Sequence, residues 1–177
     1  MLHKRRDELA AVGAHYSAHG IASGAHHLVA AAVHPSAWRM HADALPEDRD
    51  AYFAETARQI LSDADAAGHE TVVLSSEYLW GSFPAHLYKS FRAGFPDCKF
   101  EVVAYVRRPE AWVVSSYLQA LKNGEPRTFT EWFDNWKGRW ASGIHYFRVI
   151  NRWNHFLSAD KVHLVRYGDA KANVYKA

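Results

Sequence analysis

Apolar and polar positions alternate along the chain with two different periods, which predicts strands and helices in turn. The clearest helical pattern covers residues 46–67, where apolar residues recur every three or four positions before Gly68. Residues 100–106 are almost continuously apolar, which predicts a strand covered on both faces. Further strands are expected at residues 71–75 and 161–167.

Shorter amphipathic segments bounded by proline or glycine predict the remaining helices, at residues 4–12, 26–33, 83–93, 109–122, 130–136 and 145–157. Residues 13–24 are interpreted as a loop. Strands that alternate with helices are typical of an α/β fold, with a parallel sheet flanked by helices. A length of 177 residues favours a single domain. Ligands of such sheets bind beyond the carboxyl ends of the strands.

The composition narrows the class of protein. Hydrophobic residues make up 49% of the chain, which is enough for a packed core. The formal charge of +2 gives no indication of a nucleic-acid partner. Cys98 is the only cysteine, which excludes an internal disulfide framework and favours a reducing, cytoplasmic location. No apolar run is long enough to span a membrane, and we expect no secretory signal.

The histidines raise the question of a metal site. His15 and His19 are four residues apart, and His26 and His27 follow, so three imidazoles could in principle hold zinc. The His-Glu-x-x-His pattern is absent, however, and we expect no metal. Contact between a substrate and His26 or His27 is the preferred interpretation. The Gly-x-Ser-x-Gly motif of hydrolases, the Cys-x-x-Cys motif of redox proteins and the Gly-x-Gly-x-x-Gly motif of dinucleotide-binding proteins are also absent.

Arg107 and Ser115 are the first candidate binding residues. The predicted strand ends in Arg107, Pro109 opens the next helix, and Ser115 follows in that helix. A helix N-terminus attracts anions, and a guanidinium group fits phosphate or sulfate oxygens. The alternative is an ordinary surface arrangement, in which Arg107 pairs with Glu110 and Ser115 bonds to its own helix backbone.

Glu77 is the candidate catalytic residue. It follows the predicted strand at residues 71–75, where a carboxylate can act as a general base toward a substrate hydroxyl. Alternatively, Glu77 lies in the first turn of a short helix capped by Ser75 or Ser76. The two interpretations are compatible.

Residues 105–117 resemble the 3′-phosphate-binding segment of the sulfotransferases, which carry Arg-x-Pro after a strand and a serine eight residues after the arginine. That family moves a sulfuryl group from the co-substrate 3′-phosphoadenosine 5′-phosphosulfate to an acceptor hydroxyl or amine. The resemblance implies that Arg107 and Ser115 hold the 3′-phosphate. It also implies a P-loop nucleoside-triphosphatase-like fold and an acceptor that is a carbohydrate, a lipid or a small molecule.

Three further segments resemble parts of bacterial sulfotransferase-like proteins. Residues 72–77 imply Glu77 as the acceptor-side base, and residues 24–28 imply His26 and His27 near the acceptor. Residues 162–169 resemble the family's late strand and imply Tyr167 near the adenine or the 3′-phosphate, although Gly168 replaces the family's glutamate.

The resemblance begins after the family's first strand and phosphate-binding loop and stops before its C-terminal basic loop. We therefore expect a partial domain, inactive by itself. A non-catalytic module that binds an anion or nucleotide, or another protein, is the main alternative. A kinase-like phosphotransferase would need a metal-binding acid, for which Asp169 is the candidate.

Overall fold

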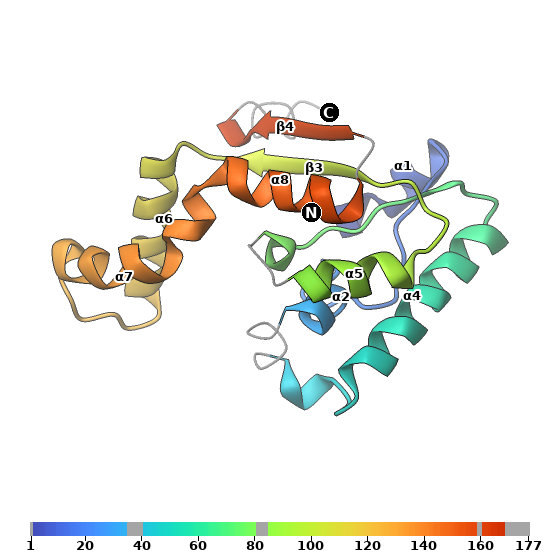
Figure 1. The fold of residues 1–177 in the computed structure, drawn as a ribbon, viewed down its shortest axis with the longest axis horizontal. Coiled ribbons are helices and arrows are strands. Elements are labelled where there is room, and N and C mark those ends of the chain that lie inside the picture. The colour runs from blue at the N-terminus through green and yellow to red at the C-terminus, as the bar shows by residue number, and fades with distance from the viewer. Residues whose placement is uncertain (1, 35–40, 81–84, 159–160, 169–177) are drawn as a thin grey trace. The chain divides into compact units, whose positions relative to one another are not determined.

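The computed structural model describes residues 2–34, 41–80, 85–158 and 161–168, without the side chains of 42 and 138–144. The chain divides into two compact units, an N-terminal unit of Met1–Cys98 and a C-terminal unit of Lys99–Ala177. Each unit combines helices with a small parallel sheet, so the protein is of mixed α/β class (Figure 1). The two units are described separately.

The N-terminal unit contains nine elements among its described residues: η1 (Leu2–Arg5), α1 (Arg6–Ala11), β1 (Ala14–His15), α2 (His27–Val33), η2 (Ala42–Ala44), α4 (Arg49–Ala66), β2 (Thr71–Val72), η3 (Glu77–Leu79) and α5 (Ala85–Gly94). Strands β1 and β2 are parallel, with Ala14 opposite Thr71. The short sheet brings the segments that follow the two strands close to each other.

Helices α2, α4 and α5 form the core of this unit (Figure 1). Helix α2 is apolar on almost every side, and α4 and α5 each turn one apolar face inward. The buried side chains include Val29, Val33, Phe53, Ile60, Leu87 and Phe91. Full burial of one such side chain is worth about 1.5–3 kcal/mol.

Helix α4 begins at Arg49 rather than at the predicted residue 46. The carboxylate of Asp48 accepts a hydrogen bond from the N–H of Ala51 at 2.9 Å and so caps the helix.

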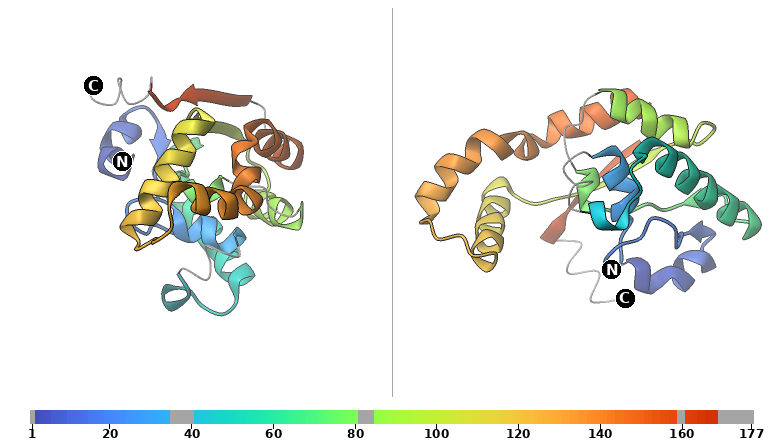
Figure 2. Two further views of the ribbon diagram at one scale, coloured as in Figure 1. Left: turned by 90° about the vertical axis from the view of Figure 1, so that its left-hand side faces the viewer. Right: turned by 90° about the horizontal axis from the view of Figure 1, so that it is seen from below.

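The C-terminal unit contains β3 (Glu101–Val106), α6 (Pro109–Lys122), α7 (Phe129–Ile144), α8 (Tyr146–Leu157) and β4 (Lys161–Arg166). Strands β3 and β4 are parallel along their whole length, and α8 contacts both of them (Figures 1 and 2). Val103 and Tyr105 are 55% and 59% exposed. The predicted burial of β3 on both faces is therefore not observed.

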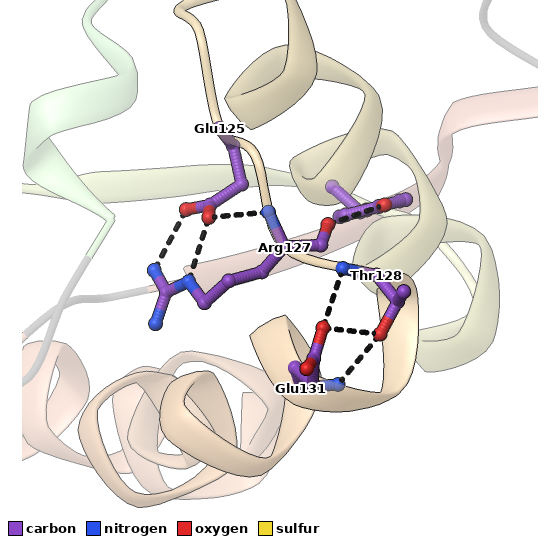
Figure 3. Close-up of polar contacts among 5 residues, drawn as sticks. Glu125, Arg127, Thr128 and Glu131 are labelled. Carbon is purple, nitrogen blue, oxygen red and sulfur yellow. Dashed lines mark hydrogen bonds and ion pairs between the residues drawn. The ribbon is translucent and has the colours of Figure 1, made fainter.

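The turn between α6 and α7 is fixed by local polar contacts (Figure 3). The side chain of Thr128 caps the N–H of Glu131, and the carboxylate of Glu131 accepts the N–H of Thr128 at 2.9 Å. This capping box starts α7 at Phe129, one residue before the predicted start. Arg127 and Glu125 form a bidentate ion pair in the same turn, with distances of 2.6 and 2.7 Å.

Most predicted elements are present. Helix α6 has the predicted bounds, and α2, α8 and β4 differ from prediction by one residue. The interpretation of residues 13–24 as a loop is wrong at β1, because a strand of two residues is too short to show an alternating pattern. Helix α5 begins at Ala85, and predicted positions 83–84 lie outside the described residues.

Candidate functional site

The C-terminal unit brings together three of the residues singled out from the sequence. Arg107 directly follows β3, and Tyr167 directly follows β4. Because Val106 lies opposite Arg166 in the parallel pair, both residues leave the sheet at the same edge. The Nη1 group of Arg107 donates to Oγ of Ser115 on α6 at 3.1 Å. The guanidinium carbon of Arg107 lies 3.8 Å from the centre of the Tyr167 ring.

The ordinary surface roles considered for Arg107 and Ser115 belong instead to their neighbours. Glu110 pairs with Arg108, at 3.4 Å. The hydroxyl of Ser116 donates to the carbonyl of Trp112 at 2.9 Å, one helical turn back. Arg107 makes no ion pair with any residue that the structure describes. Its charge is therefore not neutralised within the described part of the chain.

The remaining donors at this edge have no hydrogen-bond partner among the described residues. Ser115 accepts a hydrogen bond from Arg107, so its own hydroxyl hydrogen can be donated elsewhere. The guanidinium group keeps N–H groups beyond the one directed at Ser115. The N-terminus of α6 adds the favourable end of a helix dipole. Together they form a cationic, hydrogen-bond-donating site.

Tyr146 holds the backbone of this site in place. Its hydroxyl donates to the carbonyl oxygen of Arg107. Burial raises the pKa of Tyr146, Glu110 adds to the rise, and Arg107 opposes it. The phenol therefore stays protonated and remains a donor. No local sequence pattern indicates this contact, because Tyr146 is 39 positions from Arg107.

Glu77 lies in the N-terminal unit at the start of η3. Ser76 caps that turn, because its hydroxyl oxygen accepts the N–H of Tyr78 at 3.1 Å. An Oε2 atom of Glu77 lies 3.5 Å from Nε2 of His27. The Glu77 side chain is 73% exposed, whereas that of His27 is only 8% exposed. The predicted cap is present. The strand is shorter than predicted, because β2 ends at Val72, and Glu77 follows it after a short irregular segment.

The contacts of His27 indicate where its proton lies. Nδ1 of His27 is 2.8 Å from the hydroxyl of Ser76. Because the oxygen of Ser76 already accepts the Tyr78 N–H, its hydrogen is free to point at Nδ1. The ring proton then resides on Nε2, which faces the carboxylate of Glu77. One carboxylate oxygen of Glu77 lies near the imidazole of His27, and most of the Glu77 side chain is exposed to solvent.

His26 occupies a different environment from His27. Its side chain is fully buried, and its Nδ1 accepts the N–H of Ser75 at 3.2 Å. The hydroxyl of Tyr16 lies 2.8 Å from that of Ser75 and completes the cluster. Burial lowers the pKa of His26 to about 4, against a smaller raising effect of the Ser17 backbone. His26 is therefore a neutral, packed ring, and the edge that faces Glu77 belongs to His27.

Comparison of the chain with protein-family models, with curated proteins and with solved structures found no match to any of them. A functional assignment therefore depends on the geometry of the sites.

Within the described ranges, no three His, Cys, Asp or Glu side chains are grouped so that they could hold a metal ion. In the same part of the chain, no helix is long and apolar enough to cross a bilayer. Asp169 lies outside the described residues.

Proposed function

We propose that this chain is a sulfotransferase-like domain, built on part of a P-loop nucleoside-triphosphatase-like fold, that binds 3′-phosphoadenosine 5′-phosphosulfate. The observation that carries the proposal is the convergence of Arg107, Ser115 and Tyr167 at one edge of the β3–β4 sheet. Parallel sheets bind ligands at that edge. A guanidinium that has no acidic partner among the described residues and a hydroxyl with a free hydrogen suit the 3′-phosphate of the nucleotide.

Each residue of the convergence has a distinct task in nucleotide binding. Arg107 supplies charge and paired N–H donors to the phosphate oxygens, and Ser115 supplies one further O–H donor. Tyr167 stacks on the guanidinium and keeps its plane fixed, which reduces the entropy lost when the nucleotide binds. These residues orient the co-substrate and take no part in bond making.

On the acceptor side, Glu77 is the proposed general base. The acceptor oxygen or nitrogen attacks sulfur, the bond from sulfur to the bridging phosphate oxygen breaks, and adenosine 3′,5′-bisphosphate leaves. The proton of the acceptor passes to the exposed carboxylate of Glu77. His27 orients that carboxylate through Nε2, and His26 supports the segment through Ser75. A carbohydrate, lipid or small-molecule hydroxyl or amine fits this chemistry.

Calorimetric titration with adenosine 3′,5′-bisphosphate tests the binding half of the proposal. The variant Arg107→Ala removes a charged donor pair and should weaken binding by roughly 30- to 100-fold. Arg108→Ala is the matched control, because its side chain is 86% exposed and pairs with Glu110. That control should change the affinity by less than about threefold. Equal affinity of the Arg107→Ala variant and the unaltered chain would overturn the proposal.

The second candidate is a non-catalytic nucleotide-binding module. It is favoured by the fact that Arg107, Ser115 and Tyr167 all belong to the C-terminal unit, whereas Glu77 belongs to the N-terminal unit. Incubation with 3′-phosphoadenosine 5′-phosphosulfate and a panel of acceptors separates the two candidates. Release of the bisphosphate that stops in Glu77→Gln supports the enzyme. Tight binding without any release leaves nucleotide binding as the function of this chain by itself, in line with the inactivity that the resemblance implies.

A further inference from the structure

A pocket of about 340 Å³ in the N-terminal unit is not used by the proposed function. It lies where η1 and α1 meet β1 and the residues before β2. Its polar lining is dominated by basic groups and consists of His3, Lys4, Arg6, Asp7, His15 and His69, together with Tyr16. Asp7 is the one acid among these lining residues. The volume is within the range of small-ligand sites.

The cations of this pocket are not neutralised by the described residues. Neither Lys4 nor Arg6 makes an ion pair with any residue in the described ranges. Their neighbour Arg5 does not line the pocket and instead pairs with Glu8 at 2.6 Å. The same short segment therefore holds one guanidinium in an ion pair and two cations that form no ion pair in the described ranges. Unpaired positive charges around a hollow attract anions.

Two imidazoles add unsatisfied polar groups to the wall. The rings of His15 and His69 lie with their centres 5.9 Å apart. Nε2 of His15 and Nδ1 of His69 are buried without a hydrogen-bond partner among the described residues. A buried polar atom without a partner costs about 1–3 kcal/mol, so a ligand that draws these rings outward would relieve that cost.

The electrostatic surroundings of His15 favour its neutral form in the absence of a ligand. Burial lowers its pKa most strongly, and the nearby His69, Arg6 and His19 lower it further, while Asp63 on α4 opposes them. A bound anion would act in the opposite direction and favour the protonated ring. Binding of an anion and uptake of a proton should therefore be coupled.

We propose that this pocket is a binding site for a tetrahedral oxyanion, namely inorganic phosphate or the phosphate group of a small monoester. An ammonium, a guanidinium and two imidazoles line the pocket, and groups of these kinds can donate to several oxygens of a tetrahedral anion. Metal cations are disfavoured by the same basic lining. The proposal does not depend on nucleotide binding at Arg107.

The test is a calorimetric titration of inorganic phosphate in the Arg107→Ala background, which removes the other anion site. Saturable binding is expected at pH 6.5, and Arg6→Gln should weaken it about tenfold or more. The matched control is Arg5→Gln, one residue away. Its affinity for phosphate should stay within about twofold of that of the Arg107→Ala protein. A parallel titration with methyl phosphate distinguishes a free ion, which would bind better, from an ester group. No saturable binding, or equal loss in Arg5→Gln and Arg6→Gln, would overturn the proposal.

The proton coupling gives a second readout on the same protein. The imidazole signal of His15 is followed by NMR during a pH titration, with and without phosphate. Saturating phosphate should move its midpoint upward, because a bound anion favours the protonated ring. An unchanged midpoint of His15 under saturating phosphate would contradict the assigned site.

Discussion

The polar clusters around His26 and Arg107 use their hydrogen-bonding groups in different ways. In the N-terminal unit, His26 is fully buried and its Nδ1 accepts the N–H of Ser75, while its Nε2 is buried without a partner among the described residues. In the C-terminal unit, Arg107 is only half-buried, contacts Ser115 and Tyr167, and has no acidic partner in the described residues. Convergence of polar residues is therefore not enough to indicate a ligand site. The decisive feature of the Arg107 cluster is that its unused donors belong to a side chain that is partly exposed.

This difference predicts how each cluster responds to mutation. Removal of a group that the protein itself uses should lower stability, because its partners lose their hydrogen bonds inside the core. Removal of an unused group should leave the fold intact and weaken binding. His26 and Arg107 represent the two extremes, and Glu77 lies between them, since it is held by His27 but is 73% exposed.

The largest expected effect is the loss of stability in His26→Ala. The substitution leaves a cavity beside Tyr16 and removes the acceptor of the Ser75 N–H, which together should cost about 4 kcal/mol. Urea denaturation followed by circular dichroism measures this change. His86→Ala is the control, because His86 is exposed on α5 and its loss should cost less than about 0.5 kcal/mol. Similar stabilities of the two variants would contradict the structural role of His26.

The second effect is a loss of stability in acid that depends on His26. In the folded protein, the pKa of His26 of about 4 lies below the ordinary histidine value of 6.5, so the unfolded chain binds the proton more readily. The contribution of neutral His26 to the free energy of unfolding is fully present above pH 6.5 and is lost as the pH falls toward 4. Each pH unit in that window should cost about 1.4 kcal/mol. Urea midpoints of the unaltered chain and His26→Gln, measured from pH 7 to 4.5, should diverge, with the flatter profile in the variant. Parallel profiles would contradict the buried, neutral state.

Much of the C-terminal site could be predicted from sequence because its geometry is local. A strand ending at Val106 and a helix beginning at Pro109 fix the position of Arg107, and Ser115 follows in the second turn of that helix. Tyr167 was identified by resemblance, and the parallel register of β3 and β4 explains why it lies beside Arg107. Tyr146 was missed, because its contact with Arg107 depends on the packing of α8 and on no nearby motif.

The N-terminal unit was less predictable because its contacts join distant segments. His26 and Ser75 are 49 positions apart and meet only because β1 and β2 pair, and β1 is too short to recognise. His26 is the N-cap of α2 and His27 is its first residue, so the orientation of this helix decides which of the two rings faces Glu77. The sequence of two adjacent histidines does not reveal that orientation.

The capping box of Thr128 and Glu131, by contrast, is visible in the sequence, and the predicted helix start overlooked it.

The third effect tests whether Ser115 acts on the nucleotide rather than on the fold. Ser115→Ala removes one neutral donor, which should weaken binding of adenosine 3′,5′-bisphosphate about fivefold. Ser116→Ala is the matched control, because its hydroxyl is bonded to the carbonyl of Trp112 within the same helix. That control should leave the affinity within about 1.5-fold. Calorimetry on the two variants measures both values, and a larger loss in Ser116→Ala would indicate that the helix rather than the hydroxyl matters.

The smallest expected effect is the change in stability of Glu77→Gln, and it is the most informative about the N-terminal unit. An exposed carboxylate 3.5 Å from an imidazole nitrogen contributes little, so the free energy of unfolding should change by less than about 0.5 kcal/mol. Glu70→Gln, at an exposed position before β2, should behave in the same way. A loss above about 1 kcal/mol in Glu77→Gln alone would place Glu77 with His26 among the groups that the protein itself uses. The N-terminal unit would then have no carboxylate at η3 available to accept a proton from an acceptor.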